Sequence, residues 1–399
     1  MEKNNSVLAG EFSQNICGTY KRRDICFSRG NGATLFDKKG KKYIDLLSGL
    51  GVNNLGYAHP ALINEIKKAA GGLLHVSNLF QIESQVELSR LIQKNAFPGK
   101  CFFCNSGTEA NEAAYKLAMK YSKNVSPQKK EIISMLNSFH GRTMGSLSLT
   151  GQIKYQSSFK PLLPVTYCNY SNIPELKRKI NRNTAAVFVE VVQGEGGVYI
   201  ASREFLQELR SLCNYHQALL IIDEVQTGCG RTGKPFAWQH YDIVPDVITM
   251  AKGLAGGLPI GSMLVSSKYA DILEPGDHAS TFGGNPFVTR VALKAFSILT
   301  SPVFLQKAEK NAGYLAKGLD SLLAGKKSLL ETRRLGMMLA LEFKEGVNTD
   351  ELAEKLSARG IIVNSIKNKI IRLLPPLVIS KNEIDYALGV FKHVFSGLE

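Results

Sequence analysis

Two short apolar runs in this chain each lead into a residue with a reactive side chain. Leu219–Ile222 runs into Asp223, and Val247–Met250 is followed, after one alanine, by Lys252. If both runs are strands of an open α/β sheet, these residues lie at the strand ends where such sheets bind ligands. A carboxylate and an amine there suit a cofactor that needs one negative partner and one covalent amine, as pyridoxal phosphate does. The alternative interpretation is structural, with Asp223 as a helix cap and Lys252 as a surface lysine.

A third segment has the composition of a phosphate site. Asn105–Asn111 follows a strand-like run and opens a helix, with Ser106, Gly107 and Thr108 at its start. Glycine lets the backbone approach closely, the hydroxyls can donate, and a helix N-terminus offers free N–H groups and positive potential. An ordinary helix cap with a glutamate behind it would give the same pattern.

Two loops carry aromatic, basic or hydroxyl side chains. In Ser138–Thr143, Phe139 could stack on a planar cofactor and Arg142 could hold a carboxylate through two hydrogen bonds. The small-residue loop His278–Pro286 could present a hydroxyl to a phosphate. The structural alternatives are a surface loop with a solvated arginine and a plain linker.

The segment Glu190–Gly197 places two carboxylates and three glycines in eight residues, which indicates a tight loop near a site. A buried glutamate without a partner is costly, so we expect a cation opposite Glu195. Arg372, in a short run that ends at Pro375-Pro376, is the candidate. A sheet-edge arginine outside the site is the alternative.

Strand-like runs alternate with helix-like segments between about residues 100 and 270, which predicts a mostly parallel sheet with crossover helices. The amphipathic segments Glu109–Ser122 and Glu204–Tyr215 are the clearest helices. The expected strands are Lys100–Cys104, Glu131–Leu136, Ala185–Val192, Ala218–Asp223, Val247–Met250 and Gly261–Val265.

From about residue 285 the pattern changes to that of a smaller α+β domain. It predicts a long helical stretch, three strand-like runs and a final helix: Pro286–Leu315, Met337–Phe343, Ile361–Ile366, Ile370–Leu374 and Lys381–Phe395. We therefore expect a large cofactor-binding domain over residues 51–285 and a small domain over 286–399. Residues 1–50, with a hairpin at Thr34–Tyr43, should pack with the small domain or with a partner subunit.

Composition favours a soluble cytoplasmic protein without nucleic acid, membrane or metal as partner. The chain has 399 residues, no apolar run of membrane-spanning length and no apolar core of a signal peptide. Seven scattered cysteines indicate reduced thiols, and Cys101-Phe102-Phe103-Cys104 has no second pair to complete a metal site. The net charge of +15 is spread over many short lysine pairs, which argues against a nucleic-acid surface.

Taken in order, these segments resemble the class III pyridoxal-phosphate aminotransferases, and most closely the acetylornithine aminotransferase group. The resemblance covers nearly the whole chain, from Gly30-Asn31-Gly32 to Arg372-Leu373-Leu374-Pro375-Pro376-Leu377. It implies an α/β fold of the aspartate aminotransferase-like type (fold type I) and a transaminase of amino and oxo acids. It also implies a homodimer with shared active sites.

The resemblance assigns cofactor contacts residue by residue. Lys252 should bind pyridoxal phosphate covalently and move the proton during transfer, and Asp223 should pair with the ring nitrogen. The remaining contacts implied are Phe139 and Val225 on the two ring faces, Gln226 near the ring 3-oxygen, and Ser106, Gly107 and Thr108 around the phosphate. Thr281 should reach the phosphate of the neighbouring subunit.

On the substrate side, the resemblance makes Arg142 the carboxylate anchor and Glu195 with Arg372 a switch pair, with Ser280 also on that side. Glu195 should neutralise Arg372 in one half-reaction and release it for the second carboxylate of glutamate or 2-oxoglutarate in the other. This arrangement argues against an aminomutase or racemase, and the presence of both Lys252 and Asp223 argues against a non-catalytic binding protein.

The expected substrate is inferred from positions at which this chain differs from other members of the family. Ornithine aminotransferases carry a tyrosine at the position of Leu50, and an apolar residue there suits an acylated amine better than a free ammonium. This favours N-acetylornithine, and leaves ornithine, N-succinylornithine, N-succinyl-diaminopimelate or a lysine-pathway analogue open. Ala255 and Val191 also depart from the family, which often has glycine and proline there.

Overall fold

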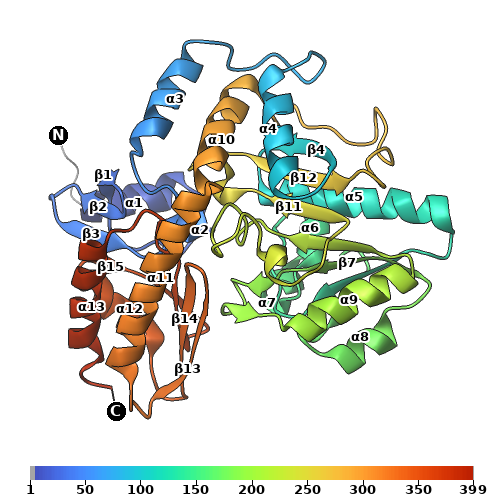
Figure 1. The fold of residues 1–399 in the computed structure, drawn as a ribbon. Coiled ribbons are helices and arrows are strands. Elements are labelled where there is room, and N and C mark those ends of the chain that lie inside the picture. The colour runs from blue at the N-terminus through green and yellow to red at the C-terminus, as the bar shows by residue number, and fades with distance from the viewer. Residues whose placement is uncertain (1–4, 399) are drawn as a thin grey trace.

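A seven-stranded sheet is the framework of the larger part of the molecule (Figure 1). The computed structural model describes residues 5–398. Six strands run in one direction, and β12 is antiparallel to both of its neighbours. In spatial order the strands are β4 (Gly99–Cys104), β12 (Gly261–Ser266), β11 (Val247–Met250), β10 (Leu219–Asp223), β7 (Thr184–Val189), β5 (Glu131–Met135) and β6 (Thr166–Cys168). The predicted mostly parallel sheet is therefore confirmed.

Helices cover both faces of this sheet, which explains why its central strands are apolar without alternation. β7 and β10 are buried at every residue. Alternate residues of these two strands join two separate apolar clusters, one with α5 (Gly107–Val125) and one with α9 (Arg203–Tyr215). The other elements of this part are α3 (Pro60–Ala70), α4 (Glu83–Asn95), α6 (Met144–Leu149), α7 (Ile153–Gln156), α8 (Ile173–Lys179), β8 (Val192–Gln193), β9 (Tyr199–Ile200) and the 3-10 turns Ser157–Phe159, Ala237–His240 and Lys252–Ala255.

The smaller part combines both ends of the chain, as the blue strands beside the red helices in Figure 1 show. One sheet has the order β1-β2-β3-β15, and in it β3 pairs in parallel with β15. A second sheet has the order β13-β14-β17-β16. The bounds are α1 (Asn5–Asn15), β1 (Phe27–Asn31), β2 (Thr34–Asp37), β3 (Lys42–Asp45), α11 (Pro302–Leu323), β13 (Leu329–Leu335), β14 (Met338–Phe343), α12 (Thr349–Ala358), β15 (Ile361–Ile362), β16 (Asn364–Ile366), β17 (Ile370–Leu373) and α13 (Lys381–Phe395). The helix α10 (Pro286–Leu299) leads into this part but packs mainly on α3, α4 and the 3-10 turn Lys252–Ala255 of the larger part.

One short element has unusual handedness. In α2 (Ser48–Gly51) all four residues have positive φ, between 47° at Ser48 and 81° at Gly51. A run of such residues winds in the left-handed sense, which costs L-residues about 1–2 kcal/mol each. Ser48 and Leu50 are the two non-glycine residues that bear this cost.

Three elements that were predicted to be continuous are each divided in two. The stretch Pro286–Leu315 is two helices, because Pro302 lacks the N–H that a continuous helix needs and begins α11 instead. The run Ala185–Val192 leaves the large sheet after Val189, and Val192 then pairs with β9. Ile361–Ile366 changes sheets at Val363, since β15 pairs with β3 and β16 with β17.

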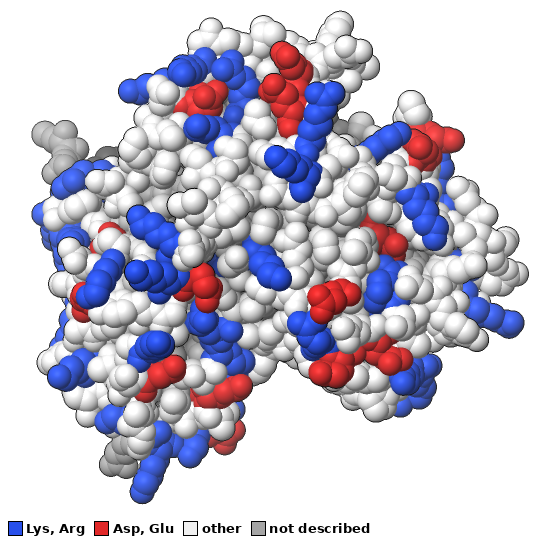
Figure 2. Space-filling view, viewed as in Figure 1, with Lys and Arg blue, Asp and Glu red and all other residues white. Residues whose placement is uncertain are grey.

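The hairpin predicted at Thr34–Tyr43 is present as β2 and β3. The domain boundaries at residues 50 and 285 stay predictions. Among the described residues no single helix is long and apolar enough to cross a membrane, and only α10 with α11, bent by 63°, meets that test as a pair by length and composition. Figure 2 shows basic side chains spread among acidic ones on the face in view.

Candidate active site

A cavity of about 400 Å³ lies where the parallel strands of the large sheet end. Its walls come from the segments that follow β4, β5, β7, β10 and β11 and from Val52, so six separate parts of the chain meet there. Parallel strands bring their carboxyl ends to one edge, which is why these segments converge. Of the predicted site residues, those that line the cavity are Ser106, Gly107, Thr108, Phe139, Arg142, Glu195, Asp223, Val225, Gln226 and Lys252.

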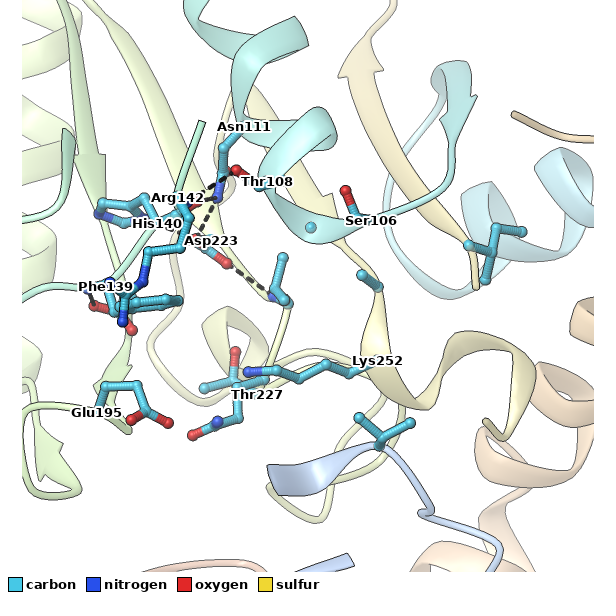
Figure 3. Close-up of a pocket in the computed structure, with 18 of the residues that line it drawn as sticks. Ser106, Thr108, Asn111, Phe139, His140, Arg142, Glu195, Asp223, Thr227 and Lys252 are labelled. Atoms are coloured by element: carbon cyan, nitrogen blue, oxygen red, sulfur yellow. Dashed lines mark hydrogen bonds and ion pairs between the residues drawn. The ribbon is translucent and has the colours of Figure 1, made fainter. Parts of the chain in front are cut away.

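The Asp223 carboxylate, at the end of β10, is held by three donors. One oxygen accepts from Asn111 Nδ2 and pairs with His140 Nδ1, both at 2.7 Å. The other oxygen accepts from the backbone N–H of Val225 at 2.9 Å. Asn111 is itself fixed, because it also donates to the His140 carbonyl and accepts from Thr249 Oγ1. Figure 3 shows Asn111, His140 and Asp223 gathered on one side of the cavity.

The first turn of α5 forms another wall. Ser106 is the N-cap, and its hydroxyl accepts from Glu109 N and donates to the Glu109 carboxylate at 2.7 Å. A Cβ at Gly107 would lie 2.7 Å from Val225 Cγ1, so only glycine fits between the helix and that side chain. Thr108 Oγ1 lies 2.9 Å from Thr143 Oγ1. The first N–H groups of a helix have no partner within it, which leaves this turn able to bind an anion.

Lys252 follows β11 and reaches into the cavity (Figure 3). Its φ of 42° lies in the left-handed region, a strain that is found mostly where a site demands it. Burial lowers the pKa of its amine, and the charges of Glu195 and Asp223 oppose that shift only in part. The amine is therefore closer to its neutral form than a surface lysine, as a proton-transfer group requires.

The predicted ion pair between Glu195 and Arg372 is present, with Oε1 and Nη1 at 2.7 Å. Arg372 is fully buried on β17, and its Nη1 also donates to the Gly194 carbonyl at 2.8 Å. Burial raises the pKa of Glu195, but Arg372 and Lys252 together outweigh it and leave that pKa below its ordinary value. The pair links the small part of the molecule to the cavity.

Phe139 and Arg142 form the outer edge. The Arg142 guanidinium lies over the Tyr155 ring at 3.9 Å and near the Phe139 ring at 5.5 Å. Arg142 is exposed, and no carboxylate within residues 5–398 lies at ion-pair distance from it. Below it, the backbone N–H of Phe139 donates to the carboxylate of Glu190 at 3.1 Å. Burial, reinforced by the charge of Asp223, raises the pKa of Glu190 well above its ordinary range.

The family model of the class-III aminotransferases matches residues 18–395 of this sequence. This chain belongs to the class-III aminotransferases. It is 42% identical over 383 residues to the acetylornithine aminotransferase of Caldanaerobacter subterraneus subsp. tengcongensis, covering 96% of this chain and 97% of that one. It is also 42% identical over 380 residues to the acetylornithine aminotransferase of Clostridium acetobutylicum, covering 94% of this chain and 98% of that one.

Solved structures of other aminotransferases have the same fold. The ornithine aminotransferase of Toxoplasma gondii superposes with a TM-score of 0.94 at 30% identity, over 99% of this chain and 95% of that one. The N-acetylornithine aminotransferase of Stenotrophomonas maltophilia superposes with a TM-score of 0.84 at 30% identity, over 96% of this chain and 98% of that one. The predicted family, the fold type and the transferase activity are thereby confirmed.

The class-III family uses pyridoxal phosphate, and the cavity of this aminotransferase fits that group. Lys252 offers an amine with a lowered pKa, Asp223 a fixed carboxylate, and the turn at Gly107 an anion site that a Cβ would obstruct. Phe139 and Val225 add apolar side chains to the lining, as a flat ring would need. The predicted cofactor is confirmed at the level of the family.

Three predicted residues do not line the cavity of this aminotransferase: Arg372, which contacts it through Glu195, and Ser280 and Thr281. Thr281 is exposed, and Ser280 Oγ is engaged by Asn105 Nδ2 at 3.2 Å and by Gly283 N at 3.1 Å. Ser280 therefore acts within the chain as a loop anchor, and its substrate role stays a prediction. So does the contact of Thr281 with a neighbouring subunit.

Sequence reasoning gave no role to three residues that shape the site. Asn111 and His140 fix Asp223, and Glu190 supports Phe139. Asn111 could have been found, because it lies four residues after Gly107 and so on the same helix face. His140 sits inside the motif already identified, but which side its ring faces depends on the tertiary fold.

Proposed function

We propose that this aminotransferase transfers the side-chain amino group of N2-acetyl-L-ornithine to 2-oxoglutarate, a step of arginine biosynthesis. The observation that carries the proposal is the Glu195–Arg372 pair, whose carboxylate lines the same cavity as Lys252 and Asp223. A site that accepts two substrates with different numbers of carboxylates needs a positive charge that can be neutralised for one substrate and made available to the other.

Pyridoxal phosphate, when bound, supplies the electron sink for the reaction. Lys252 Nζ would hold it and carry the proton to and from the substrate carbon, for which its lowered pKa is suited. Asp223 would keep the ring nitrogen protonated, since its carboxylate is fixed by three donors and buried. Ser106, Gly107 and Thr108 would bind the phosphate, Gln226 would face the ring 3-oxygen, and Phe139 and Val225 would enclose the ring.

The substrate carboxylates would be bound by two arginines. Arg142 is exposed at the mouth of the cavity and stacked on Tyr155, so its donors are available to an α-carboxylate. Arg372 would be neutralised by Glu195 while the acylated amino donor is bound. It would then bind the second carboxylate of 2-oxoglutarate once Glu195 turns away.

N-acetylornithine is the substrate favoured by Leu50, which is 42% exposed on the left-handed turn α2. An apolar side chain offers no partner to a free ammonium but can contact an acyl group. Ornithine, N-succinylornithine and N-succinyl-diaminopimelate remain the alternative donors. The curated relatives at 42% identity are acetylornithine enzymes, which supports the first choice.

An absorbance spectrum of the purified enzyme with pyridoxal phosphate tests this proposal. We expect N-acetylornithine to convert the band of the bound cofactor to that of its amine form, and 2-oxoglutarate to restore it with release of glutamate. Conversion by ornithine or a succinylated donor alone would overturn the acetyl assignment. A protein that develops no cofactor band would overturn the role of Lys252.

We further propose a homodimer with shared active sites, active in the cytoplasm. Apolar side chains are exposed around Thr281: Leu73, Leu74, Leu79, Phe80 and Phe282 are 58–89% exposed. Asn78 joins the two segments that carry them by donating to the Ser280 and Gly283 carbonyls. We refer to Leu73, Leu74, Leu79, Phe80 and Phe282 as the apolar patch. Such a patch is typical of a protein interface.

The proposed location in the cytoplasm is supported by the cysteines, because seven free thiols suit a reducing compartment.

A further inference from the structure

We propose that Asn364 is a positioning residue for Arg372, holding the guanidinium through a neutral acceptor so that its charge stays available to the substrate. Asn364 lines no part of the cavity and has no role in the function proposed above. The inference rests on that function and specifies how the switch pair works.

The sheet places Asn364 directly beside Arg372. The two residues are paired in register between the antiparallel strands β16 and β17, so their side chains share one face. Asn364 Oδ1 accepts from Arg372 Nη2 at 2.8 Å. The Asn364 amide is oriented by its own bond from Nδ2 to the Ser365 carbonyl at 3.2 Å. The oxygen is therefore turned toward the guanidinium, as the hydrogen-bond network requires.

Arg372 has three acceptors, of which only one can leave. Gly194 O and Asn364 Oδ1 are neutral and belong to the backbone and to a paired strand, whereas Glu195 is a charged side chain on a loop. Within residues 5–398, Glu195 is the one carboxylate at ion-pair distance from Arg372. When Glu195 turns away, the two neutral acceptors keep the guanidinium in place without cancelling its charge.

Counting donors shows what becomes free. A guanidinium has five N–H groups in a fixed plane. Both N–H groups of Nη1 are engaged, by Gly194 and Glu195, and one of Nη2 by Asn364. The Nε–H has no partner among the described residues. Departure of Glu195 thus opens donors for an incoming carboxylate, while the bonds to Gly194 and Asn364 hold the plane of the group.

A neutral residue at position 364 is essential to this arrangement. A carboxylate there would pair with Arg372 permanently, because β16 cannot carry it away as the loop carries Glu195. The half-reaction with the acylated donor, in which Arg372 is neutralised anyway, would tolerate the change. The half-reaction with 2-oxoglutarate would lose its second carboxylate site.

Single-turnover absorbance measurements on the cofactor-loaded enzyme separate the two half-reactions. For Asn364→Asp, which preserves the size of the side chain, we expect the apparent Kd for 2-oxoglutarate to rise about tenfold or more. We expect the N-acetylornithine half-reaction to stay within about twofold of wild type. Asn364→Ala should weaken 2-oxoglutarate less, because it removes the anchor but adds no charge.

Ser365→Ala is the matched control, since the neighbouring hydroxyl bonds to Thr349 and not to Arg372. It should leave both half-reactions unchanged. Equal effects of Asn364→Asp on both half-reactions, or no effect on either, would overturn the assignment. If the wild-type enzyme reacts with neither substrate, the proposed function itself fails, an outcome distinct from failure at position 364.

Discussion

At the scale of single residues, the site depends on side chains that never need to touch the substrate. Asn111 holds Asp223 and takes its own support from Thr249. We predict that Asn111→Ala weakens cofactor binding about tenfold or more, because a hydrogen bond to a charged group contributes about 1.5–3 kcal/mol. Titration of the protein with pyridoxal phosphate, followed by absorbance, measures this. Thr249→Val removes only the support and should have a smaller effect; the reverse order would contradict the interpretation.

Glu224, the residue after Asp223, is a second buried acid with a different role. Burial raises its pKa to about 7, against the opposing effect of hydrogen bonds from Thr227 and the Trp238 N–H. The folded protein thus holds this proton more tightly than the unfolded chain, whose carboxyl has a pKa of 4.5. The stability that the group contributes is complete below pH 4.5 and is lost as the pH rises through about 7.

We predict that Glu224→Gln removes this part of the pH dependence. Relative to wild type, its free energy of unfolding should improve on the order of 1–3 kcal/mol between about pH 5 and pH 8. Denaturant unfolding at both pH values, at one protein concentration and with the cofactor held constant, checks the difference. If the difference in free energy of unfolding between the two proteins does not change with pH, Glu224 is ionised over the whole range tested.

At the scale of elements, the left-handed turn α2 is kept in place by contacts from elsewhere in the chain. The Ser48 hydroxyl donates to the Leu374 carbonyl at 2.6 Å and accepts from Arg231 Nη2 at 3.2 Å. Gln226, a cavity residue, donates to the Leu50 carbonyl at 3.4 Å. The turn that carries Leu50, for which we propose a role in substrate choice, is therefore joined to the site and to the strand end that follows Arg372.

Two substitutions at Ser48 separate the hydroxyl from the backbone strain. Both Ser48→Ala and Ser48→Gly lose the two hydrogen bonds, but only glycine adopts a φ of 47° without steric cost. We predict that both variants have a lower free energy of unfolding than wild type. The free energy of unfolding of the glycine variant should exceed that of the alanine variant by about 1 kcal/mol. Thermal or denaturant unfolding of the three proteins tests the order. An alanine variant as stable as the glycine variant would mean that the turn is not strained.

Elements with strong local signals were predictable, and their partners were not. The apolar runs that form β10 and β11, and the cap at Ser106, follow from local pattern. The pairing of β3 with β15 joins residues more than three hundred positions apart, so no local pattern predicts it. The same holds for the site: Asp223 and Lys252 stand out in the sequence, whereas the contacts that orient Asp223 arise only in the folded chain.

At the scale of the whole molecule, Arg231 connects the parts that form the site. It is fully buried, and its guanidinium donates to the Met337 and Pro375 carbonyls, to Asn54 Oδ1 and to Ser48 Oγ. These partners lie at residues 48 and 54 near the N-terminus and at residues 337 and 375 near the C-terminus. Burial lowers the pKa of Arg231 to about 9, with Asp45 opposing the shift. One side chain thus holds together segments that the sequence keeps far apart.

The apolar patch gives the last prediction, which concerns assembly. Leu79 is 89% exposed and directly follows Asn78, whose Nδ2 donates to the Ser280 and Gly283 carbonyls on either side of Thr281. A charge at Leu79 would therefore face any partner covering Thr281. We predict that Leu79→Asp shifts the enzyme from dimer to monomer in sedimentation and lowers its activity, because burying an unpaired carboxylate in an interface is costly. Val303→Asp, at a residue 77% exposed on α11, is the matched control and should remain dimeric. Since the proposed phosphate contact of Thr281 crosses between subunits, the monomer should also bind pyridoxal phosphate more weakly. A Leu79→Asp protein with the mass and cofactor affinity of the control would place the interface elsewhere and remove Thr281 from the site.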